Sequence, residues 1–298
     1  MPILTKNRRF ANIILVADLW IMFTGKRDRM RELDPARIKE KELEILLALQ
    51  DFCRKEGLTV YISGGSLLGA VRHEGFIPWD DDIDVCMPRP HYMRLIQAAK
   101  EGRFPCAPLR LISYELGDFP LPFSKIVNED TRVDTAYMDI PEADSIWIDI
   151  MPVDGLPRDE AARNRMYDRV QFVRNILMTA YARYGTGTTL FYRLIKLILI
   201  PVSRLCGKKR CSALLYRMAT ENDYETSDMV GAVTWGLYGR GEAMSKKEFE
   251  RAVSVTFEGH TFDTMSCWDS YLKNLYGDYM TLPPVEKRTT HEMKAWEL

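Results

Sequence analysis

Apolar positions along this chain fall into two patterns that predict different secondary structure. In some segments they recur at three- and four-residue steps, which predicts helices at residues 35–56, 67–73, 88–99, 159–184, 189–206, 209–223 and 268–276. In others they form short runs bounded by Gly, Pro or Asp, which predicts strands at residues 58–62, 83–87, 109–114, 123–128, 146–150, 230–235 and 253–257. We therefore expect an α+β fold, a mixed sheet flanked by helices, with a largely helical second half.

The order of these elements divides the chain into three stretches. Residues 1–34 form an N-terminal helical segment, residues 35–157 a mixed α/β core, and residues 158–298 a mostly helical region that returns to complete the site. No flexible linker marks the boundaries between them. The first core helix has the clearest start, because Asp34 precedes Pro35 in the order typical of a helix N-terminus.

The composition is that of an ordered globular protein. At 298 residues, 46% hydrophobic and 28% charged, the chain is long enough for one large or two closely packed domains. These values exclude a disordered, collagenous or coiled-coil protein. Lys and Arg number 41 against 42 Asp and Glu, so a net charge of −1 gives no overall attraction to nucleic acid, and we expect no nucleic-acid partner.

Cysteine usage points to a reducing compartment. Six cysteines are scattered along the chain without CxxC spacing, at positions 53, 86, 106, 206, 211 and 267. Cys53 and Cys86 have apolar neighbours, which predicts buried thiols in place of metal ligands or bridges. We therefore expect a cytoplasmic protein.

An apolar stretch at residues 10–24 has basic residues on both sides and resembles a membrane anchor in outline. Asn12 and Asp18 interrupt it, and it is shorter than the roughly 20 residues that a spanning helix needs. We expect a packed or interfacial helix here, not a transmembrane span.

The most unusual segment places four carboxylates within five residues, at positions 80, 81, 82 and 84. On a strand that starts near Asp82, Asp82 and Asp84 point to one face while Ile83 and Val85 point to the other. Two carboxylates on one face suit a hard divalent cation such as Mg²⁺. An acidic surface turn is the alternative, but the alternation with Ile and Val favours the metal site.

Two further features support a site for phosphate chemistry. Gly64 and Gly65, followed by Ser66, lie between a predicted strand and a helix, where backbone amides favour phosphate; taken alone, this motif is better explained as a plain turn. Asp149 is embedded in the apolar run at residues 146–151, where burial is unfavourable unless the carboxylate is paired or metal-bound. The alternative, a carboxylate that bonds a neighbouring loop, is the one we favour for Asp154.

The order of strand, Gly-Gly-Ser, helix and D-x-D strand is similar to that of polymerase-beta-like nucleotidyltransferases. Residues 64–84 (GGSLLGAVRHEGFIPWDDDID) further resemble the signature of the LicD family, which includes bacterial phosphocholine transferases and is related to fukutin and fukutin-related protein. The resemblance continues in short motifs at residues 125–131, 147–155, 257–259 and 276–291. Cys86 and Met87 depart slightly from the aliphatic residues expected after the D-x-D strand.

This resemblance implies an Mg²⁺-dependent phosphotransferase with a nucleotidyltransferase-like fold. Such an enzyme moves phosphocholine or a phospho-polyol from a CDP-activated donor to a hydroxyl of a surface glycan, a lipid-linked glycan or a teichoic acid precursor, and releases CMP. By position, Asp82, Asp84 and Asp149 would hold Mg²⁺, as two ions, and Asp149 could also serve as the base. Gly64, Gly65 and Ser66 would contact donor phosphate.

Other residues in the resembling motifs are candidates for substrate binding. Lys125 would neutralise charge on the leaving nucleotide, or be an ordinary surface lysine. Arg72 and His73 lie near the phosphate loop, although a histidine at a helix end needs no ligand. Arg288 is suited to bidentate phosphate contact and His291 follows it, unless this charged segment is only solvated. For Trp79, a core position is favoured over a wall of the site.

A second apolar stretch, residues 190–200, carries Arg193 and Lys196, and basic residues follow it at 204–210. A buried core helix of the second half is the interpretation we favour. The alternative is an amphipathic helix on an anionic membrane surface, which would give peripheral contact with the inner face of the membrane through residues 190–210.

Two other functions fit the same motifs. One is a nucleotidyltransferase that leaves the nucleoside monophosphate on its substrate, which the mass of the product would distinguish. The other is a non-catalytic module that binds nucleotide or glycan, which has no need of three converging carboxylates. Donors with choline, ribitol, glycerol and ethanolamine headgroups all remain open.

Overall fold

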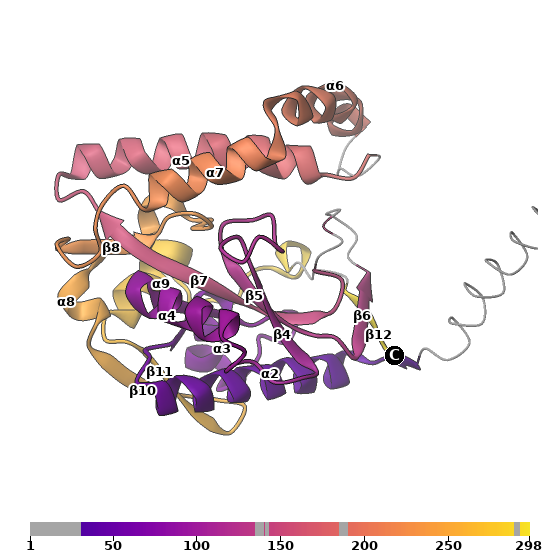
Figure 1. Ribbon diagram of the computed structural model, residues 1–298, viewed down its shortest axis with the longest axis vertical. Helices are drawn as coiled ribbons and strands as arrows, with labels where there is room; N and C mark the ends of the chain where they lie inside the picture. Colours follow the sequence, from indigo (N-terminus) through magenta and orange to yellow (C-terminus); the bar gives the residue numbers. More distant parts are fainter. Residues whose placement is uncertain (1–30, 135–139, 141–142, 185–189, 289–292) are drawn as a thin grey trace, which may run out of the picture.

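The computed structural model describes residues 31–134, 140, 143–184, 190–288 and 293–298, and these form a mixed α+β fold (Figure 1). A seven-stranded sheet lies at its centre, with strand order β2-β3-β7-β5-β4, and with β8 pairing β7 and β9. Its strands are β2 (Tyr61–Ile62), β3 (Asp84–Pro88), β4 (Leu109–Ser113), β5 (Ser124–Asn128), β7 (Ile146–Leu156), β8 (Met229–Ala232) and β9 (Met244–Ser245). The expected α+β class is confirmed.

Strand β7 is the axis of this sheet. Its first five residues pair with β5, which runs antiparallel, and its middle, from Asp149 to Val153, pairs with β3, which runs parallel to it. Its second half pairs with β8, so a strand from the C-terminal part of the chain completes the sheet. The parallel pairing of β3 with β7 brings the starts of these two strands to the same edge.

Two small sheets flank the central one. β1 (Arg31–Leu33), β12 (Lys294–Glu297) and β6 (Thr131–Asp134) form one of them, and this places the C-terminus beside the first described strand (Figure 1). The hairpin of β10 (Ala252–Phe257) and β11 (His260–Met265) forms the other.

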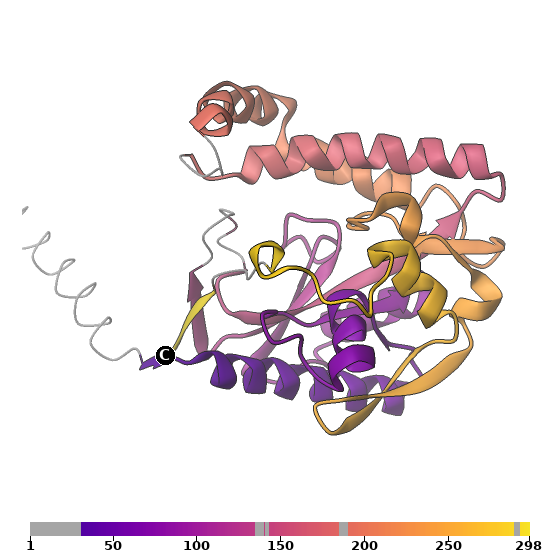
Figure 2. The same ribbon diagram turned by 180° about the vertical axis from the view of Figure 1, so that it is seen from behind.

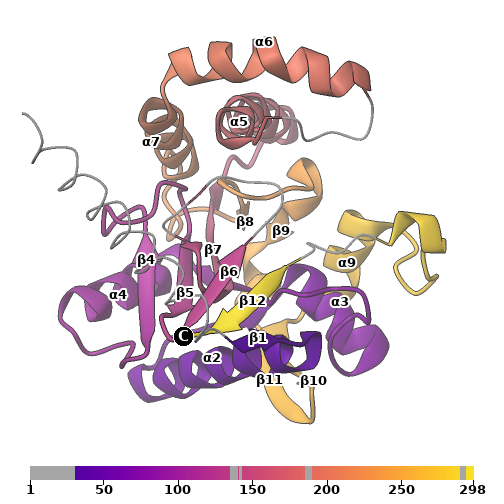
Figure 3. The same ribbon diagram turned by 90° about the vertical axis from the view of Figure 1, so that its right-hand side faces the viewer.

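The helices lie in layers on both sides of the sheet. They are α2 (Pro35–Glu56), α3 (Gly64–His73), α4 (Arg89–Lys100), α5 (Glu160–Tyr181), α6 (Leu190–Cys206), α7 (Lys208–Ala219), α8 (Lys246–Phe249) and α9 (Trp268–Tyr276), with short 3₁₀ turns η2 (Gly239–Glu242) and η3 (Val285–Lys287). Figure 3 shows α2 below the sheet, α5 and α7 above it, and α6 lying across them as the outermost layer. Figure 2 shows the same order from behind.

Buried apolar side chains form one cluster on each face of the sheet. Along β5, Ile126 belongs to the cluster that includes Leu49 of α2, whereas the next residue, Val127, belongs to the cluster that includes Leu177 of α5. This is the alternation that a strand buried on both faces requires.

Helix α2 is confirmed with the limits that the sequence predicts. The Asp34 side chain accepts a hydrogen bond from the Arg37 amide at 2.9 Å, as an N-terminal cap does. Gly57 ends the helix in the left-handed region, with a φ of 61°.

Three predicted limits near the chemically interesting residues are wrong. α3 begins at Gly64 instead of after the glycines, β3 begins at Asp84 instead of near Asp82, and β7 continues to Leu156. Asp82 therefore precedes the strand, and Asp154 lies within a strand instead of a turn. The pattern also misses β1, β6, β9, β11 and β12, because these short strands are rich in polar residues.

The prediction of a buried core helix at residues 190–200 is wrong for much of α6. Five large apolar side chains on it are exposed to solvent: Leu197, Ile198, Leu199, Val202 and Leu205. Among the described ranges, no helix has both the length and the apolar character needed to cross a bilayer. The predicted N-terminal helix at residues 10–24 lies outside the described residues.

Candidate active site

The first feature of the site is a pair of acids on adjacent strands. Asp84, the first residue of β3, is in register with Asp149 of β7. Neighbouring strands lie about 4.8 Å apart, and paired residues of parallel strands point to the same face. Asp84 is fixed at both ends of its backbone: its amide donates to Ser66 Oγ at 2.8 Å, and its carbonyl accepts from the Ser63 amide at 3.1 Å.

The two glycines at the start of α3 lie against acidic side chains. A Cβ atom on Gly64 would lie 2.9 Å from Asp84 Oδ2, and one on Gly65 would lie 2.9 Å from Asp80 Oδ2. Gly64 also has a φ of +54°, which other residues rarely adopt. The structure thus requires glycine at residue 64 for its backbone angle, and at residues 64 and 65 to admit carboxylates beside the amino end of α3, where the helix dipole favours negative charge.

Lys125 supplies the positive charge at the acid pair. Its Nζ atom lies 2.5 Å from Asp149 Oδ1, and its side chain is only 9% exposed. The ammonium also lies 4.1 Å from the centre of the Trp147 ring, with Phe119 and Phe123 farther away on other sides. The alternative of an ordinary surface lysine is wrong, because β5 directs this side chain into the interior.

Glu42 is a further acid, close to the loop of Asp80, Asp81 and Asp82 that leads to Asp84, and no sequence motif marks it. It is fully buried on α2, and neither carboxylate oxygen has a hydrogen-bond partner among the described residues. Burial raises its pKa well above the ordinary value, and the charges of Asp82, Asp81 and Asp80 raise it further. The signal was present in the sequence, since Glu42 falls on the apolar stripe of a predicted helix.

Two arginines from distant parts of the chain meet at Trp79. The Arg288 guanidinium lies 4.4 Å from the indole ring centre and that of Arg72 lies 5.9 Å from it. Burial, and then the charge of Arg288, lowers the pKa of Arg72. Trp79 packs against the core and also serves as a platform for both cations, so the two interpretations of it are both partly right. Such a cationic pair suits an anionic ligand.

His73 belongs to the same group. Its Nε2 atom accepts a hydrogen bond from Arg72 Nε at 3.0 Å, which requires an unprotonated nitrogen. Burial and the Arg72 charge lower the pKa of His73 accordingly. Arg72 also donates to the Tyr279 carbonyl at 2.8 Å, which connects this group to the segment after α9. His291, the remaining predicted binding residue, lies outside the described residues.

Two glutamates from the C-terminal part of the chain lie close to the residues of the site. Glu258 accepts a hydrogen bond from the Phe76 amide at 2.9 Å, which holds the loop that leads to the acids. Glu242 is buried, and burial raises its pKa to about 7; Asp84 is among the charges that contribute. Its Oε2 atom accepts from the Tyr271 hydroxyl at 3.4 Å. The sequence gives no motif that singles out Glu242.

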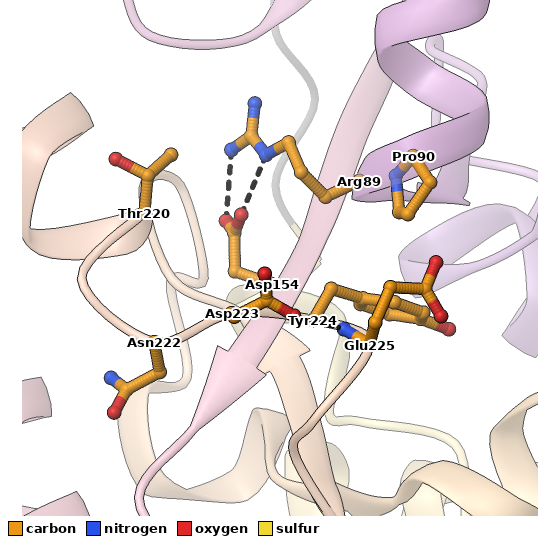
Figure 4. A pocket seen from close by; sticks show the side chains of 8 residues that line it. All are labelled: Arg89, Pro90, Asp154, Thr220, Asn222, Asp223, Tyr224 and Glu225. Atoms are coloured by element: carbon orange, nitrogen blue, oxygen red, sulfur yellow. Dashed lines mark hydrogen bonds and ion pairs between the residues drawn. The ribbon is translucent and has the colours of Figure 1, made fainter.

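The opposite end of the same strand pair carries a second buried acid, Asp154. Figure 4 shows its carboxylate held by two hydrogen bonds from Arg89, at 2.6 Å from Nε and 2.9 Å from Nη2. Arg89 also donates to Glu115 at 3.3 Å. Arg89 and Asp154 line a cavity of about 210 Å³ together with the segment that follows α7. The predicted loop partner for Asp154 is wrong: its partner is the first residue of α4.

The carboxylates near Asp84 have the chemistry of a magnesium site but do not form a preassembled one. Among the described residues, no three or more His, Cys, Asp or Glu side chains are grouped so that they could hold a metal ion. Mg²⁺ is commonly bound by one or two carboxylates together with substrate phosphates and water. Asp84 and Asp149, in register beside the two glycines, fit that mode. The ligand set of Asp82, Asp84 and Asp149 stays a prediction.

Comparison with known proteins identifies the part of the chain that holds the acid pair, the two glycines and Lys125. Residues 57–155 match the family described as "LicD/FKTN/FKRP, nucleotidyltransferase domain". The chain is 27% identical over 264 residues to the lipopolysaccharide cholinephosphotransferase LicD of Haemophilus influenzae, which covers 86% of this chain and 96% of that protein. The resemblance to the LicD family is confirmed.

Two shorter similarities fall to uncharacterized rickettsial proteins. One, from Rickettsia typhi, is 43% identical over 53 residues, which is 16% of this chain and 17% of that protein. The other, from Rickettsia prowazekii, is 40% identical over 42 residues, which is 14% of this chain and 16% of that protein.

Proposed function

We infer, from the LicD domain that this chain carries over residues 57–155, that the protein is a transferase that attaches phosphocholine to a bacterial surface glycan. The similarity to the Haemophilus lipopolysaccharide cholinephosphotransferase over 86% of the chain supports this reaction. The observation that carries it is the register of Asp84 with Asp149 beside the buried Lys125. Two acids and one cation side by side support a reaction at a phosphate group.

The donor in this proposal is a CDP-activated headgroup, CDP-choline or a CDP-polyol. An oxygen of the acceptor hydroxyl bonds to the donor phosphorus that carries the headgroup, and the diphosphate bridge breaks. CMP leaves with the bridging oxygen, and the hydroxyl proton passes to a base. The acceptor is a lipopolysaccharide, a lipid-linked glycan or a teichoic acid precursor, and the reaction takes place in the cytoplasm.

The residues around the acid pair have distinct tasks in this reaction. Asp84 and Asp149, joined by Asp82, would hold Mg²⁺, which supplies charge neutralisation at the phosphates. Asp149 accepts the proton of the attacking hydroxyl. Lys125 keeps the Asp149 carboxylate oriented through its 2.5 Å contact. Its positive charge also neutralises part of the negative charge on the leaving CMP.

The two arginines at Trp79 bind the nucleotide end of the donor. Arg72 and Arg288 present two guanidinium groups to one face of the site, and each can make paired hydrogen bonds to phosphate oxygens. His73 orients Arg72 through the hydrogen bond that it accepts. The amides of Gly64 and Gly65, with Ser66 and His291, complete the set of donor contacts. In this proposal the sheet is of the polymerase-beta-like nucleotidyltransferase type.

A second candidate is transfer of the nucleotide itself. The matching domain is described as a nucleotidyltransferase domain, which favours an enzyme that leaves CMP or another nucleoside monophosphate on its substrate. A non-catalytic module that binds nucleotide or glycan is the third candidate. The paired, half-buried acids weigh against it, because a binding module for anionic ligands gains nothing from them.

The test uses CDP-choline, CDP-ribitol and CDP-glycerol, each with Mg²⁺ and with EDTA, and a glycan acceptor. We expect Mg²⁺-dependent CMP release and an acceptor whose mass rises by one phosphocholine or one phospho-polyol. An acceptor that gains CMP would establish the second candidate instead. If no donor reacts and none binds, the transferase proposal is wrong.

A further inference from the structure

The outward face of α6 is a continuous apolar surface with no protein layer over it in the described structure. Leu205 is 85% exposed and Ile198 is 68% exposed, and Leu197, Leu199 and Val202 are about half exposed. Ile200, on the inner side, is fully buried. Figure 3 shows α6 as the outermost helix, lying across the ends of α5 and α7 and facing away from the sheet.

Helical geometry shows that the exposed residues form one stripe. At about 100° per residue, Leu197, Pro201, Leu205, Ile198 and Val202 fall in this order around an arc of roughly 140°, which Leu199 extends to about 200°. Soluble proteins seldom leave so many large apolar side chains together in water. An apolar arc of this width is typical of helices that lie in a membrane interface.

The chain around α6 is also strongly basic. Residues 169–220 contain no Asp or Glu and ten Lys or Arg, at positions 169, 174, 183, 193, 196, 204, 208, 209, 210 and 217. The remainder then holds 31 basic and 42 acidic residues, a charge of −11. The near-neutral total therefore conceals a segment with a charge of +10 inside an acidic protein.

Part of this charge lies directly beside the apolar stripe, at the C-terminal end of α6. Lys209 and Arg210, just past that end at the start of α7, are exposed. The Arg204 guanidinium lies 5.3 Å from the centre of the ring of Tyr184, which is about half exposed. A cation and a tyrosine at the edge of an apolar surface are the arrangement found where a protein meets lipid headgroups.

We propose that α6 and the start of α7 form a docking surface for an anionic lipid bilayer. The helix lies parallel to the membrane plane, with Ile198, Val202 and Leu205 in the acyl boundary and Lys209 and Arg210 at the headgroup phosphates. A second copy of the chain is a poorer occupant, because a symmetric dimer through this face would bring two segments of +10 together. The inference goes beyond the transfer reaction and does not depend on which group is transferred.

The test is flotation of the full-length chain with vesicles, without donor or acceptor. We expect binding to vesicles of phosphatidylglycerol and phosphatidylcholine in about equal parts, little binding to phosphatidylcholine alone, and weaker binding at high salt. The double variants Ile198→Glu/Leu205→Glu and Lys209→Glu/Arg210→Glu should each weaken partitioning at least about tenfold. If the glutamate pair unfolds, Ile198→Ser/Leu205→Ser replaces it.

Matched controls make the result specific to α6. Leu298→Glu and Lys247→Glu change an exposed apolar and an exposed basic residue elsewhere, and both should float as the parent protein does. The proposal is overturned if the parent protein does not float or if the α6 variants float normally. Ile14→Glu tests the apolar stretch at residues 10–24, and the proposal is also overturned if this variant alone abolishes binding. The last contradicting result is a parent protein that is a dimer, which Ile198→Glu/Leu205→Glu dissociates without affecting flotation.

Discussion

The parallel strands β3 and β7 carry an acid and its cation at each end, half-buried at one end and fully buried at the other, and the two ends differ in their contacts. At the start of the pair, Asp149 meets one lysine, with Asp84 alongside it. At the far end, the Asp154 carboxylate accepts hydrogen bonds from Nε and Nη2 of Arg89. Charges are paired at both ends, and at the far end the carboxylate has a bidentate partner.

The neighbours of each end sharpen this difference. Around Arg89, Glu115 accepts hydrogen bonds from both Arg89 and the Tyr92 hydroxyl, so a closed network surrounds Asp154. In the loop that leads to Asp84, Asp80, Asp81 and Asp82 lie near Glu42, whose carboxylate has no hydrogen-bond partner among the described residues and whose pKa their charges help to raise. A closed network stabilises a fold, whereas clustered acids that include such a buried carboxyl group suit a reaction at phosphate.

The largest effect is expected from Asp149→Asn. Because this substitution removes a carboxylate from the acid pair, transfer activity should fall by at least about 10³-fold. Activity is measured as CMP release under saturating donor. Asp168→Asn, which alters an exposed aspartate paired with Arg240 on the surface, is the control and should retain activity. Equal activity in the two variants would show that the acid pair does no chemistry.

The next largest effect is expected on the free energy of unfolding, from a substitution at the far end of the β3–β7 pair. Arg89→Met leaves Asp154 and Glu115 buried without their cation, which should lower the free energy of unfolding by about 3–5 kcal/mol. Arg110→Met removes an exposed arginine that also has two acidic partners, and it should cost about 0–1 kcal/mol. Denaturant unfolding measures both. A similar small loss in the two variants would contradict a structural role for the far end.

A pH-dependent effect is expected from Glu242, the buried acid behind Asp84. Its pKa is raised from 4.5 to about 7 in the folded state, so the folded protein binds the proton more tightly than the unfolded chain. Stability should therefore fall as the pH rises from about 4.5 to about 7, by on the order of 3 kcal/mol. Glu242→Gln removes this loss, so its melting temperature should exceed that of the parent protein at pH 8 but not at pH 4.5. A difference in melting temperature between the two proteins that stays constant from pH 4.5 to pH 8 would refute this role of Glu242.

The smallest effect is expected from Lys125→Met. The substitution keeps the aromatic contacts but removes the partner of Asp149, and we expect activity to fall about 10- to 100-fold. Lys247→Met, at an exposed lysine, is the matched control. Lys125→Arg should recover part of the activity because it restores the charge. An unchanged rate in Lys125→Met would mean that the lysine only stabilises the fold.

The sequence predicted the parts of the site that depend on local pattern. Asp84 and Asp149 stood out because each interrupts or ends an apolar strand, and α2 was predicted with its limits because its cap is local. Contacts between side chains that are distant in the sequence could not be predicted from local pattern. The contact between Lys125 and Asp149 depends on the register of two strands, and the meeting of Arg72 with Arg288 spans more than 200 residues.

The solvent exposure of apolar side chains was equally hard to predict where the same hydrophobic pattern can arise from two physical causes. An apolar stripe on a helix forms against a protein core and against a lipid surface alike, so the pattern at residues 190–206 could not decide between them. Glu42 is the converse case, since a charged residue on a buried stripe could have been noticed.

The most direct test of the account compares Asp84→Asn with Asp154→Asn, measuring turnover per folded molecule and melting temperature in the same samples. We predict that Asp84→Asn loses at least about 10³-fold in turnover and melts close to the parent temperature, because the backbone hydrogen bonds of residue 84 to Ser66 and Ser63 are kept. Asp154→Asn should keep its turnover and melt roughly 6 °C or more lower. If Asp84→Asn retains turnover, or if Asp154→Asn abolishes it without a change in melting, the division of roles between the two ends is wrong.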